Sequence, residues 1–306
     1  MGGRNRKRKG RQVNGVLLLN KPIGVSSNHA LQSVKRLYFA AKAGHTGSLD
    51  PLATGMLPIC FGEATKISAF LLEADKRYSL SCQLGANTTT GDSEGEVIET
   101  FDVSAINFSD IEKVCATFNG EIQQVPPMFS ALKHEGKRLY ALARQGIEVE
   151  RKARTVTIHD LEVKAYKEGI LDLEVFCTKG TYVRTLVEDI GKALGCGGYV
   201  TRLHRTCVGP YDGEMHTIES LQTLQAEGNT ALDAILLPME SGIASWPDVN
   251  LEANAAFYIA QGQAVQVPHA PTHGLVRLYD QDRFMGVGEI QDDGLVAPKR
   301  MIQANT

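Results

Sequence analysis

One segment near the N-terminus places a carboxylate and an imidazole among several glycines. It reads GHTGSLDPLATG over residues 44–55. Glycine permits positive φ and close backbone approach, and Pro51 and Pro58 disfavour a continuous helix. We therefore expect Asp50 on a rigid, exposed loop, where a carboxylate can act as a nucleophile or a general base. The alternative is that Asp50 forms only an Asx turn before the proline.

Four further segments carry residues that could bind a ligand or position this loop. They read NKPIGVSS at residues 20–27, DKRY at 75–78, KGTYVRTL at 179–186 and LHRT at 203–206. Together with the Asp50 segment, their order and spacing resemble the motifs of the TruB family, the bacterial tRNA pseudouridine-55 synthases. The resemblance spans most of the 306 residues. The chain departs from the common family pattern at Ser27, Ser48 and His204.

The resemblance implies an isomerase that converts uridine 55 in the T-loop of tRNAs to pseudouridine. This reaction breaks the glycosidic N–C bond of a flipped-out uridine, turns the base and rejoins it through carbon. Asp50 would be the catalytic carboxylate, attacking the sugar C1′, attacking C6 of the base or abstracting a sugar proton. Since no redox step or group donor is needed, we expect no cofactor and no metal. The sequence has no GxGxxG, Walker loop or metal-ligand cluster.

A carboxylate in a dry pocket needs a nearby cation, because burial alone favours the neutral acid. The resemblance pairs Asp50 with Arg184 for this purpose. Their separation of 134 positions means that sequence alone cannot bring them together.

The resemblance also implies a binding site for the extruded base. Extrusion from folded RNA is unfavourable unless the pocket restacks the base on an aromatic face. Tyr78 would stack on the uracil, and Tyr182 and Leu203 would line the pocket. His45 would occupy the space that the nucleotide leaves. Lys21 would support the catalytic loop or reach a phosphate.

Composition favours an ordinary globular protein of the cytoplasm. The chain is 43% hydrophobic and 22% charged. No apolar run approaches the roughly 20 residues needed to span a bilayer, so no membrane association is expected. The six cysteines are widely spaced without a CxxC pair, which favours reduced thiols over disulfides or zinc ligands.

The distribution of charge, rather than its sum of −3, indicates an RNA partner. Residues 1–11 carry a charge of +6, and residues 212–306 carry −9. Residues 133–154 hold seven cations against three acids and could follow a phosphate backbone, although a solvated helix face is the common alternative. We expect the T-arm of tRNA as partner, no obligate protein partner and a monomer. The seven expected backbone contacts are Lys133, Lys137, Arg138, Arg144, Arg151, Lys152 and Arg154.

Periodicity and turn residues predict an α+β fold with a mixed or antiparallel sheet, flanking helices and a small β-rich C-terminal domain. Ser27 is predicted to cap a helix, and SDIE at 109–112 is predicted as a capping box. Alternating apolar residues predict paired strands at 155–166 and 171–177. Further predictions are strands at 13–20, 78–84, 274–279 and 284–290, a loop at 86–94, a basic helix near 136–145, a helix ending at Gly195, a helical pair at 218–227 and 230–236, a linker at 238–247, and a short helix ending at Gly262.

These elements suggest three parts. They are a basic disordered tail at 1–12, a pseudouridine synthase catalytic domain at 13–248 with a basic insertion at about 124–154, and a PUA-like RNA-binding domain at 250–306.

Two other functions are considered. A catalytically idle tRNA-binding or RNA-folding protein would need the same basic stretch and C-terminal module, but intact Asp50, Tyr78 and Arg184 favour the enzyme. An Asp/His hydrolase would need a second convergent carboxylate or metal ligands, for which the sequence gives no pattern.

Overall fold

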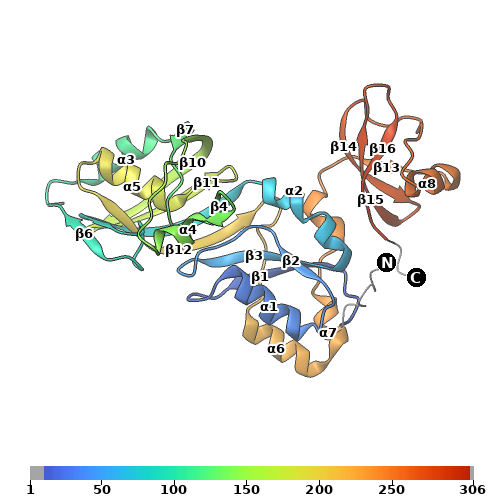
Figure 1. The fold of residues 1–306 in the computed structure, drawn as a ribbon, viewed down its shortest axis with the longest axis horizontal. Coiled ribbons are helices and arrows are strands. Elements are labelled where there is room, and N and C mark those ends of the chain that lie inside the picture. Colours follow the sequence, from blue (N-terminus) through green and yellow to red (C-terminus); the bar gives the residue numbers. More distant parts are fainter. Residues whose placement is uncertain (1–9, 304–306) are drawn as a thin grey trace.

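A mixed sheet of eight strands forms the body of the molecule (Figure 1). The computed structural model describes residues 10–303. The strands are β1 (Gly15–Lys21), β2 (Ala43–His45), β3 (Thr54–Phe61), β4 (Lys76–Leu84), β7 (Gly120–Gln124), β10 (Arg154–Lys167), β11 (Ile170–Cys177) and β12 (Gly198–Val208). Their order is β1-β3-β12-β4-β11-β10-β7, and β2 pairs with β3. Since β12 runs parallel to β3 and antiparallel to β4, the predicted mixed sheet of an α+β fold is confirmed.

Helices bury the sheet at two places. In Figure 1, α3 (Phe108–Ala116) and α5 (Val183–Ala193) lie beside β4, β10 and β11, and α1 (Ser27–Leu37), α6 (Ile218–Glu227) and α7 (Asn229–Ala234) lie beside β1 and β3. One apolar core runs through both places and includes Leu17, Leu80, Leu173 and Leu186. This shared core fixes β3, β4, β12 and α5 relative to one another.

The predicted pair of strands at 155–166 and 171–177 is confirmed by β10 and β11. In β11, Leu171, Leu173, Val175 and Cys177 are buried, whereas the residues between them are half-buried. This alternation is the period of two that a strand imposes on its side chains.

Both predicted N-caps are wrong by one or two residues. The cap of α1 is Ser26, whose hydroxyl accepts a hydrogen bond from the backbone N–H of His29. Ser27 is instead the first helical residue, and its buried hydroxyl bonds to the backbone of Leu49. The cap of α3 is Asn107, which accepts from the N–H of Asp110.

The predicted basic helix of the insertion is shorter than expected. Residues 133–138 form a two-stranded hairpin, β8 (Lys133–His134) and β9 (Lys137–Arg138), and α4 (Leu139–Ala143) follows. Glu135 and Gly136 both have positive φ, which makes the tight turn. The predicted loop 86–94 is also partly wrong, because β5 (Ala86–Thr88) pairs with β6 (Val97–Thr100).

A second sheet of four strands follows at the C-terminus. It has the order β13 (Asp248–Asn250), β14 (Gly274–Asp280), β15 (Arg283–Ile290) and β16 (Val296–Met301), and α8 (Ala253–Ala260) packs on it. The predicted linker contains a short 3-10 helix, η2 (Met239–Ile243). This helix contacts the 3-10 helix η1 (Gly62–Lys66) and α2 (Ser68–Glu73). The exact domain limits stay a prediction.

Part of the predicted N-terminal tail has a defined position. Residues 1–9 lie outside the described residues, but Arg11 forms a backbone bridge with Ala40 and an ion pair with Asp233 of α7. Among the helices of the described chain, none is long and apolar enough to cross a membrane.

Candidate active site

The loop between β2 and β3 presents Asp50 at the surface of the sheet body. The side chain of Asp50 is 47% exposed. Behind it, the N–H of Gly24 donates to the carbonyl of Pro51 at 2.8 Å, and the Ser27 hydroxyl bonds both to the carbonyl and to the N–H of Leu49. Gly47 adopts a positive φ of 111°, as the turn requires. The loop is therefore held from behind while its carboxylate faces outward.

Arg184 forms an ion pair with Asp50. Its Nη2 lies 2.8 Å from Asp50 Oδ2 and donates to the carbonyl of Phe129, and its Nη1 donates to the carbonyl of Thr90. The buried carboxylate of Asp92 lies 3.5 Å from Nη1. Arg184 is in the first turn of α5. These contacts fix the guanidinium, which in turn orients the Asp50 carboxylate.

Two cavities meet at this ion pair. The smaller has a volume of about 350 Å³ and is lined by Tyr78, Tyr182, Leu203 and other side chains of β4, α5 and β12. The larger has a volume of about 800 Å³ and extends toward the insertion. Both include Asp50 and Arg184 in their walls. A ligand that spans both cavities would therefore pass the Asp50 carboxylate.

Comparisons with known proteins identify the family. Residues 35–183 match the model of the TruB family pseudouridylate synthase N-terminal domain. Residues 184–244 match a tRNA pseudouridylate synthase B C-terminal domain, and residues 247–302 match a pseudouridine synthase II TruB C-terminal domain. The chain belongs to the TruB family.

Relatives within the TruB family match along nearly the whole chain. A protein of Nitrosococcus oceani named tRNA pseudouridine synthase B is 55% identical over 301 residues, covering 98% of both chains. A protein of Tolumonas auensis with the same name is 52% identical over 310 residues, covering 98% of this chain and 95% of its own.

Solved structures share the fold at low sequence identity. A structure of an H/ACA RNP bound to a substrate RNA containing 2′-deoxyuridine has a TM-score of 0.73 at 22% identity, covering 99% of this chain and 92% of that one. An archaeal box H/ACA sRNP Nop10-Cbf5 complex has a TM-score of 0.71 at 22% identity, covering 95% and 86%. These likenesses concern the fold alone.

The structure brings four predicted residues of the TruB motifs to the smaller cavity beside Asp50. These are Tyr78, Tyr182, Arg184 and Leu203. Burial raises the pKa of the Tyr78 phenol. Leu203 is 7% exposed and lies on β12, opposite Leu80 of β4. The predicted substrate-binding roles of these side chains stay proposals.

Lys21 and His45 lie outside the smaller cavity. The fully buried Lys21 Nζ donates to the carbonyls of Pro22, Val25 and Pro51, so it lies behind the Asp50 loop. The alternative prediction, that Lys21 reaches a phosphate, is therefore wrong. His45 lines the larger cavity, and burial lowers the pKa of its imidazole, with nearby Arg205 acting in the same direction.

The seven cations of the insertion do not share one surface. Lys133, Arg138 and Arg144 line the larger cavity. Arg151 bonds to Glu148 and to the carbonyl of Pro126, and Arg154 bonds to the carbonyl of Gly180.

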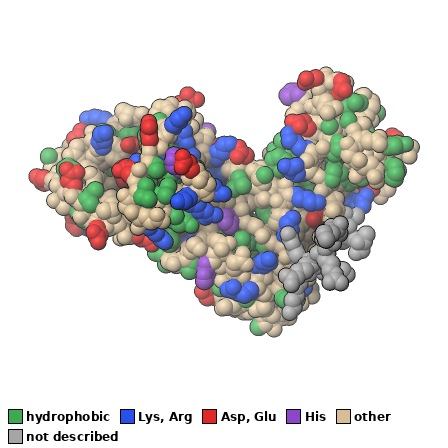
Figure 2. All heavy atoms as spheres, viewed as in Figure 1, with side chains coloured by type: hydrophobic (Ala, Val, Ile, Leu, Met, Phe, Trp, Pro, Cys, Tyr) green, Lys and Arg blue, Asp and Glu red, His purple; other side chains and the backbone are tan. Residues whose placement is uncertain are grey.

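The guanidinium of Arg154 also stacks on the Tyr182 ring, 4.8 Å from its centroid. Lys137 and Lys152 are exposed. Lys and Arg side chains gather near the centre of the face drawn in Figure 2, around α4. Three of the seven predicted contacts thus line the larger cavity, and Arg154 lines the smaller one.

The sequence analysis missed several residues of the cavities, among them Asp92, Tyr140, Arg205 and Ser130. Arg205 lies two positions after Leu203, and the strand period of two places both on one face, a signal that could have identified it. Ser130 lines both cavities, and its buried hydroxyl has no hydrogen-bond partner within the described residues. No sequence signal distinguishes Ser130 from other serines.

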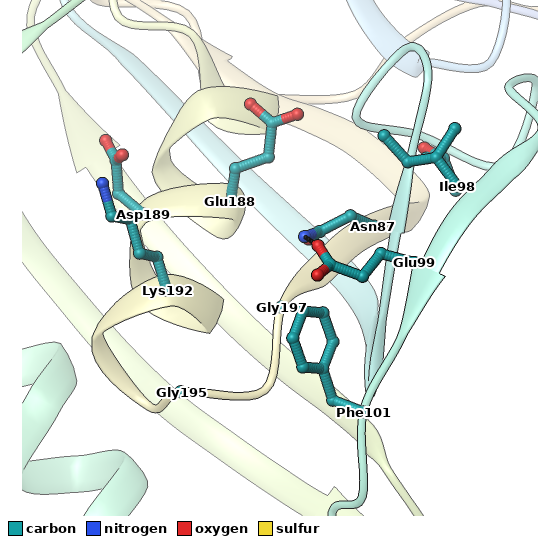
Figure 3. A pocket seen from close by; sticks show the side chains of 10 residues that line it. Asn87, Ile98, Glu99, Phe101, Glu188, Asp189, Lys192, Gly195 and Gly197 are labelled. Carbon is teal, nitrogen blue, oxygen red and sulfur yellow. Dashed lines mark hydrogen bonds between the residues drawn. The ribbon is translucent and has the colours of Figure 1, made fainter.

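A third cavity, of about 460 Å³, lies at the C-terminal half of α5 (Figure 3). Glu188, Asp189 and Lys192 of α5 line it together with Asn87, Ile98, Glu99 and Phe101. Burial raises the pKa of both Glu188 and Asp189. Three carboxylates against one lysine make this cavity unsuitable for an RNA phosphate. In the described part of the chain, no three His, Cys, Asp or Glu side chains gather as metal ligands would.

Proposed function

We propose that this protein isomerises uridine 55 in the T-loop of tRNAs to pseudouridine, with Asp50 as the catalytic carboxylate. The observation that carries the proposal is the Asp50–Arg184 ion pair of 2.8 Å, which lies where the smaller cavity meets the larger one. Membership of the TruB family and relatives named tRNA pseudouridine synthase B support the reaction and the substrate class.

The smaller cavity suits the flipped-out nucleoside. Its volume of about 350 Å³ is at the lower end of ligand pockets, which suits a single base with its sugar. The Tyr78 ring supplies an aromatic face, which is worth roughly 1–3 kcal/mol per stacked base. That contribution offsets the few kcal/mol that extrusion from the RNA costs.

The larger cavity suits the RNA from which the base is extruded. Lys133, Arg138 and Arg144 offer three cations to its phosphates. The ring of Tyr140 lies beside two of them, with Arg138 and Arg144 each within 6 Å of its centroid. We propose the T-arm as the bound element, and a monomeric enzyme without an obligate protein partner.

The isomerisation leaves the elemental composition of the base unchanged. The bond between N1 and C1′ breaks and a bond between C5 and C1′ forms. The hydrogen at C5 leaves as a proton, and N1 gains a proton from solvent. Asp50 provides the ionised carboxylate that assists this exchange, and Arg184 keeps it oriented toward the smaller cavity.

Release of tritium from tRNA that carries 5-tritiated uridine tests the proposal. Wild-type protein should release one tritium per T-loop, because only the exchange of C5 for N1 removes that hydrogen. Asp50→Asn should release none. If the wild-type protein binds the T-arm but releases no tritium, the chain is an idle RNA-binding or RNA-folding protein and the proposed function is wrong.

A further inference from the structure

Gln124 is a buried polar side chain that lies outside the cavities of the site. It is the last residue of β7 and is 0% exposed. Its partner in the strand register is Arg154, the first residue of β10. The basic insertion predicted at about 124–154 therefore begins at one member of this pair and ends at the other. Gln124 lines none of the three cavities described above.

The amide of Gln124 bonds to the backbone of Tyr182 on both sides of its Cα. The N–H of Tyr182 donates to Oε1 of Gln124 at 3.0 Å, and Nε2 of Gln124 donates to the carbonyl of Tyr182 at 3.2 Å. An amide side chain can make this pair of bonds because it offers one acceptor and two donors. Since both neighbouring peptide groups are held, the direction in which the Tyr182 side chain leaves the backbone is fixed.

Arg154 holds the same tyrosine from its ring. Its guanidinium carbon lies 4.8 Å from the centroid of the Tyr182 ring, and a cation over an aromatic face is favourable. The guanidinium also donates to the carbonyl of Gly180, two residues before Tyr182. The strand pair that closes the insertion thus holds Tyr182 by its backbone and by its ring.

The alternative role for Gln124 is structural, as a residue that only completes the end of β7. A methionine has a similar length and would fill this buried position without the cost of burying an amide. It would also leave the N–H of Tyr182 without its acceptor. The amide is therefore matched to the Tyr182 backbone. Arg184, which pairs with Asp50, follows two positions later, so the same backbone leads into the ion pair.

We propose that Gln124 is a positioning residue that fixes the Tyr182 ring in the wall of the smaller cavity. The inference rests on the proposed function, in which this cavity receives the flipped-out nucleoside. Tyr182 lines the cavity, whereas Gln124 is enclosed behind it and acts only through the tyrosine. Both ends of the basic insertion are thereby joined to the wall of the pocket.

A double-mutant cycle between Gln124 and Tyr182 tests this role. Gln124→Met removes both bonds, so the single-turnover rate at saturating enzyme should fall at least about 10-fold, as misplacement of pocket groups does. The Kd for a T-arm stem-loop should stay within about threefold of wild type, because the cations of the insertion are unchanged. Tyr182→Ala should also slow the reaction. The double variant should be no more than about threefold slower than Tyr182→Ala, since the ring to be positioned is already gone.

Gln83→Met is the matched control. Gln83 is a half-buried glutamine of β4 whose Nε2 donates to the carbonyl of Leu84. This variant should keep the wild-type rate. If Gln124→Met does not fold, Gln124→Glu provides the same cycle, because an ionised carboxylate accepts from the Tyr182 N–H but cannot donate to the carbonyl.

Fluorine-19 spectra of the free protein separate this inference from the proposed function. With 3-fluorotyrosine in place of the nine tyrosines, the signal that Tyr182→Phe removes belongs to Tyr182. Gln124→Met should shift this signal, because the ring moves relative to the Arg154 guanidinium, while Gln83→Met should leave it in place.

An unchanged Tyr182 signal in Gln124→Met, or rate losses that multiply in the double variant, would overturn the role of Gln124. Multiplied losses would mean that Gln124 acts through another group, since Tyr182→Ala keeps the backbone that Gln124 binds. A wild-type protein that releases no tritium would overturn the proposed function, and the spectra would still decide on Gln124.

Discussion

Trp246 lies edge-on against Phe70, with ring centroids 4.8 Å apart and an interplanar angle of 74°. This contact belongs to a core that the C-terminal sheet shares with the catalytic body. Ile67 of the body is 1% exposed, and Val287 of β15 is fully buried in the same cluster. Lys66 Nζ also donates to the carbonyl of Met301 in β16. The C-terminal module is therefore packed onto α2 rather than attached by a free linker.

Truncation after Pro247 should weaken binding to whole tRNA and lower the melting temperature, because it uncovers this shared core. Single-turnover chemistry at saturating enzyme should remain, because Asp50, Tyr78 and Arg184 lie in the body. Circular dichroism and tritium release with the truncated chain check both effects. A truncated chain that is folded but chemically dead would show that the module helps to assemble the site.

Asp50→Asn should abolish tritium release and leave tRNA binding within about threefold of wild type. The fold should survive, since Arg184 keeps Asp92 and the carbonyls of Thr90 and Phe129 as partners. Filter binding and single-turnover assays measure the two effects. A tenth of the wild-type rate, with deamidation back to Asp excluded by mass spectrometry, would rule out Asp50 as the catalytic carboxylate.

Arg184→Lys should lower the single-turnover rate about 100-fold or more, because an ammonium cannot keep the two-sided contacts of the guanidinium. Arg184 must satisfy Asp50, Asp92 and two carbonyls at once. Chemical denaturation of the same variant should show a lower free energy of unfolding, since buried Asp92 loses its partner. A variant with the wild-type rate would mean that the ion pair has no part in the chemistry.

Replacing the cavity-lining pair Lys133 and Arg138 by alanine should raise the Kd for the T-arm. The slope of log K against log salt should flatten by up to about 0.9 for each lost phosphate contact. Lys137 and Lys152 form the matched pair, with the same loss of charge from exposed positions outside the cavity. Salt-dependent binding should change more for the first pair, and equal slopes for both pairs would contradict the proposed phosphate path.

Because of Lys21, the free energy of unfolding should vary with pH in the alkaline range. Burial lowers the pKa of Lys21 from 10.5 to about 8. The unfolded chain then binds more protons between about pH 8 and 10.5, so this group's contribution to the free energy of unfolding rises with pH through that window. The stability difference between wild type and Lys21→Met should therefore move in favour of wild type from about pH 7.5 to 10.

Denaturation at several pH values measures this difference. Lys113→Met serves as the control for loss of an exposed charge, since the Lys113 side chain is 73% exposed. The neutral amine also offers one donor fewer to the three carbonyls behind the Asp50 loop, so the wild-type rate should decline above about pH 8. A stability difference that stays constant with pH would show that Lys21 does not titrate in this window.

Local patterns predicted four of the eight strands of the main sheet, β1, β4, β10 and β11, and part of the site. The alternation in β11 identified a strand because one of its faces is buried, and the glycine-rich segment identified an exposed loop with Asp50 at its surface. Local signals failed where a side chain serves a tertiary contact. Ser27 has the residue type of a cap, but its hydroxyl bonds to Leu49, 22 positions away.

The site could be assembled in advance only through the resemblance of the motifs. The sequence around Asp50 does not identify Arg184 as its partner, nor the reverse. Their contact depends on the packing of α5 against the sheet. Arg205 was missed because an arginine in a strand is ordinarily exposed, and only its place in β12 buries it.

The strand order also sets when the protein can become active during synthesis. β12 is the last strand of the body to be synthesised. It lies between β3, which follows the Asp50 loop, and β4, which contains Tyr78. A nascent chain that ends before Gly198 lacks Leu203 and Arg205 and has no bridge between those strands. The pocket therefore closes through contacts far apart in the chain, which form slowly. Activity must then arise in one late step, after residue 208 has left the ribosome.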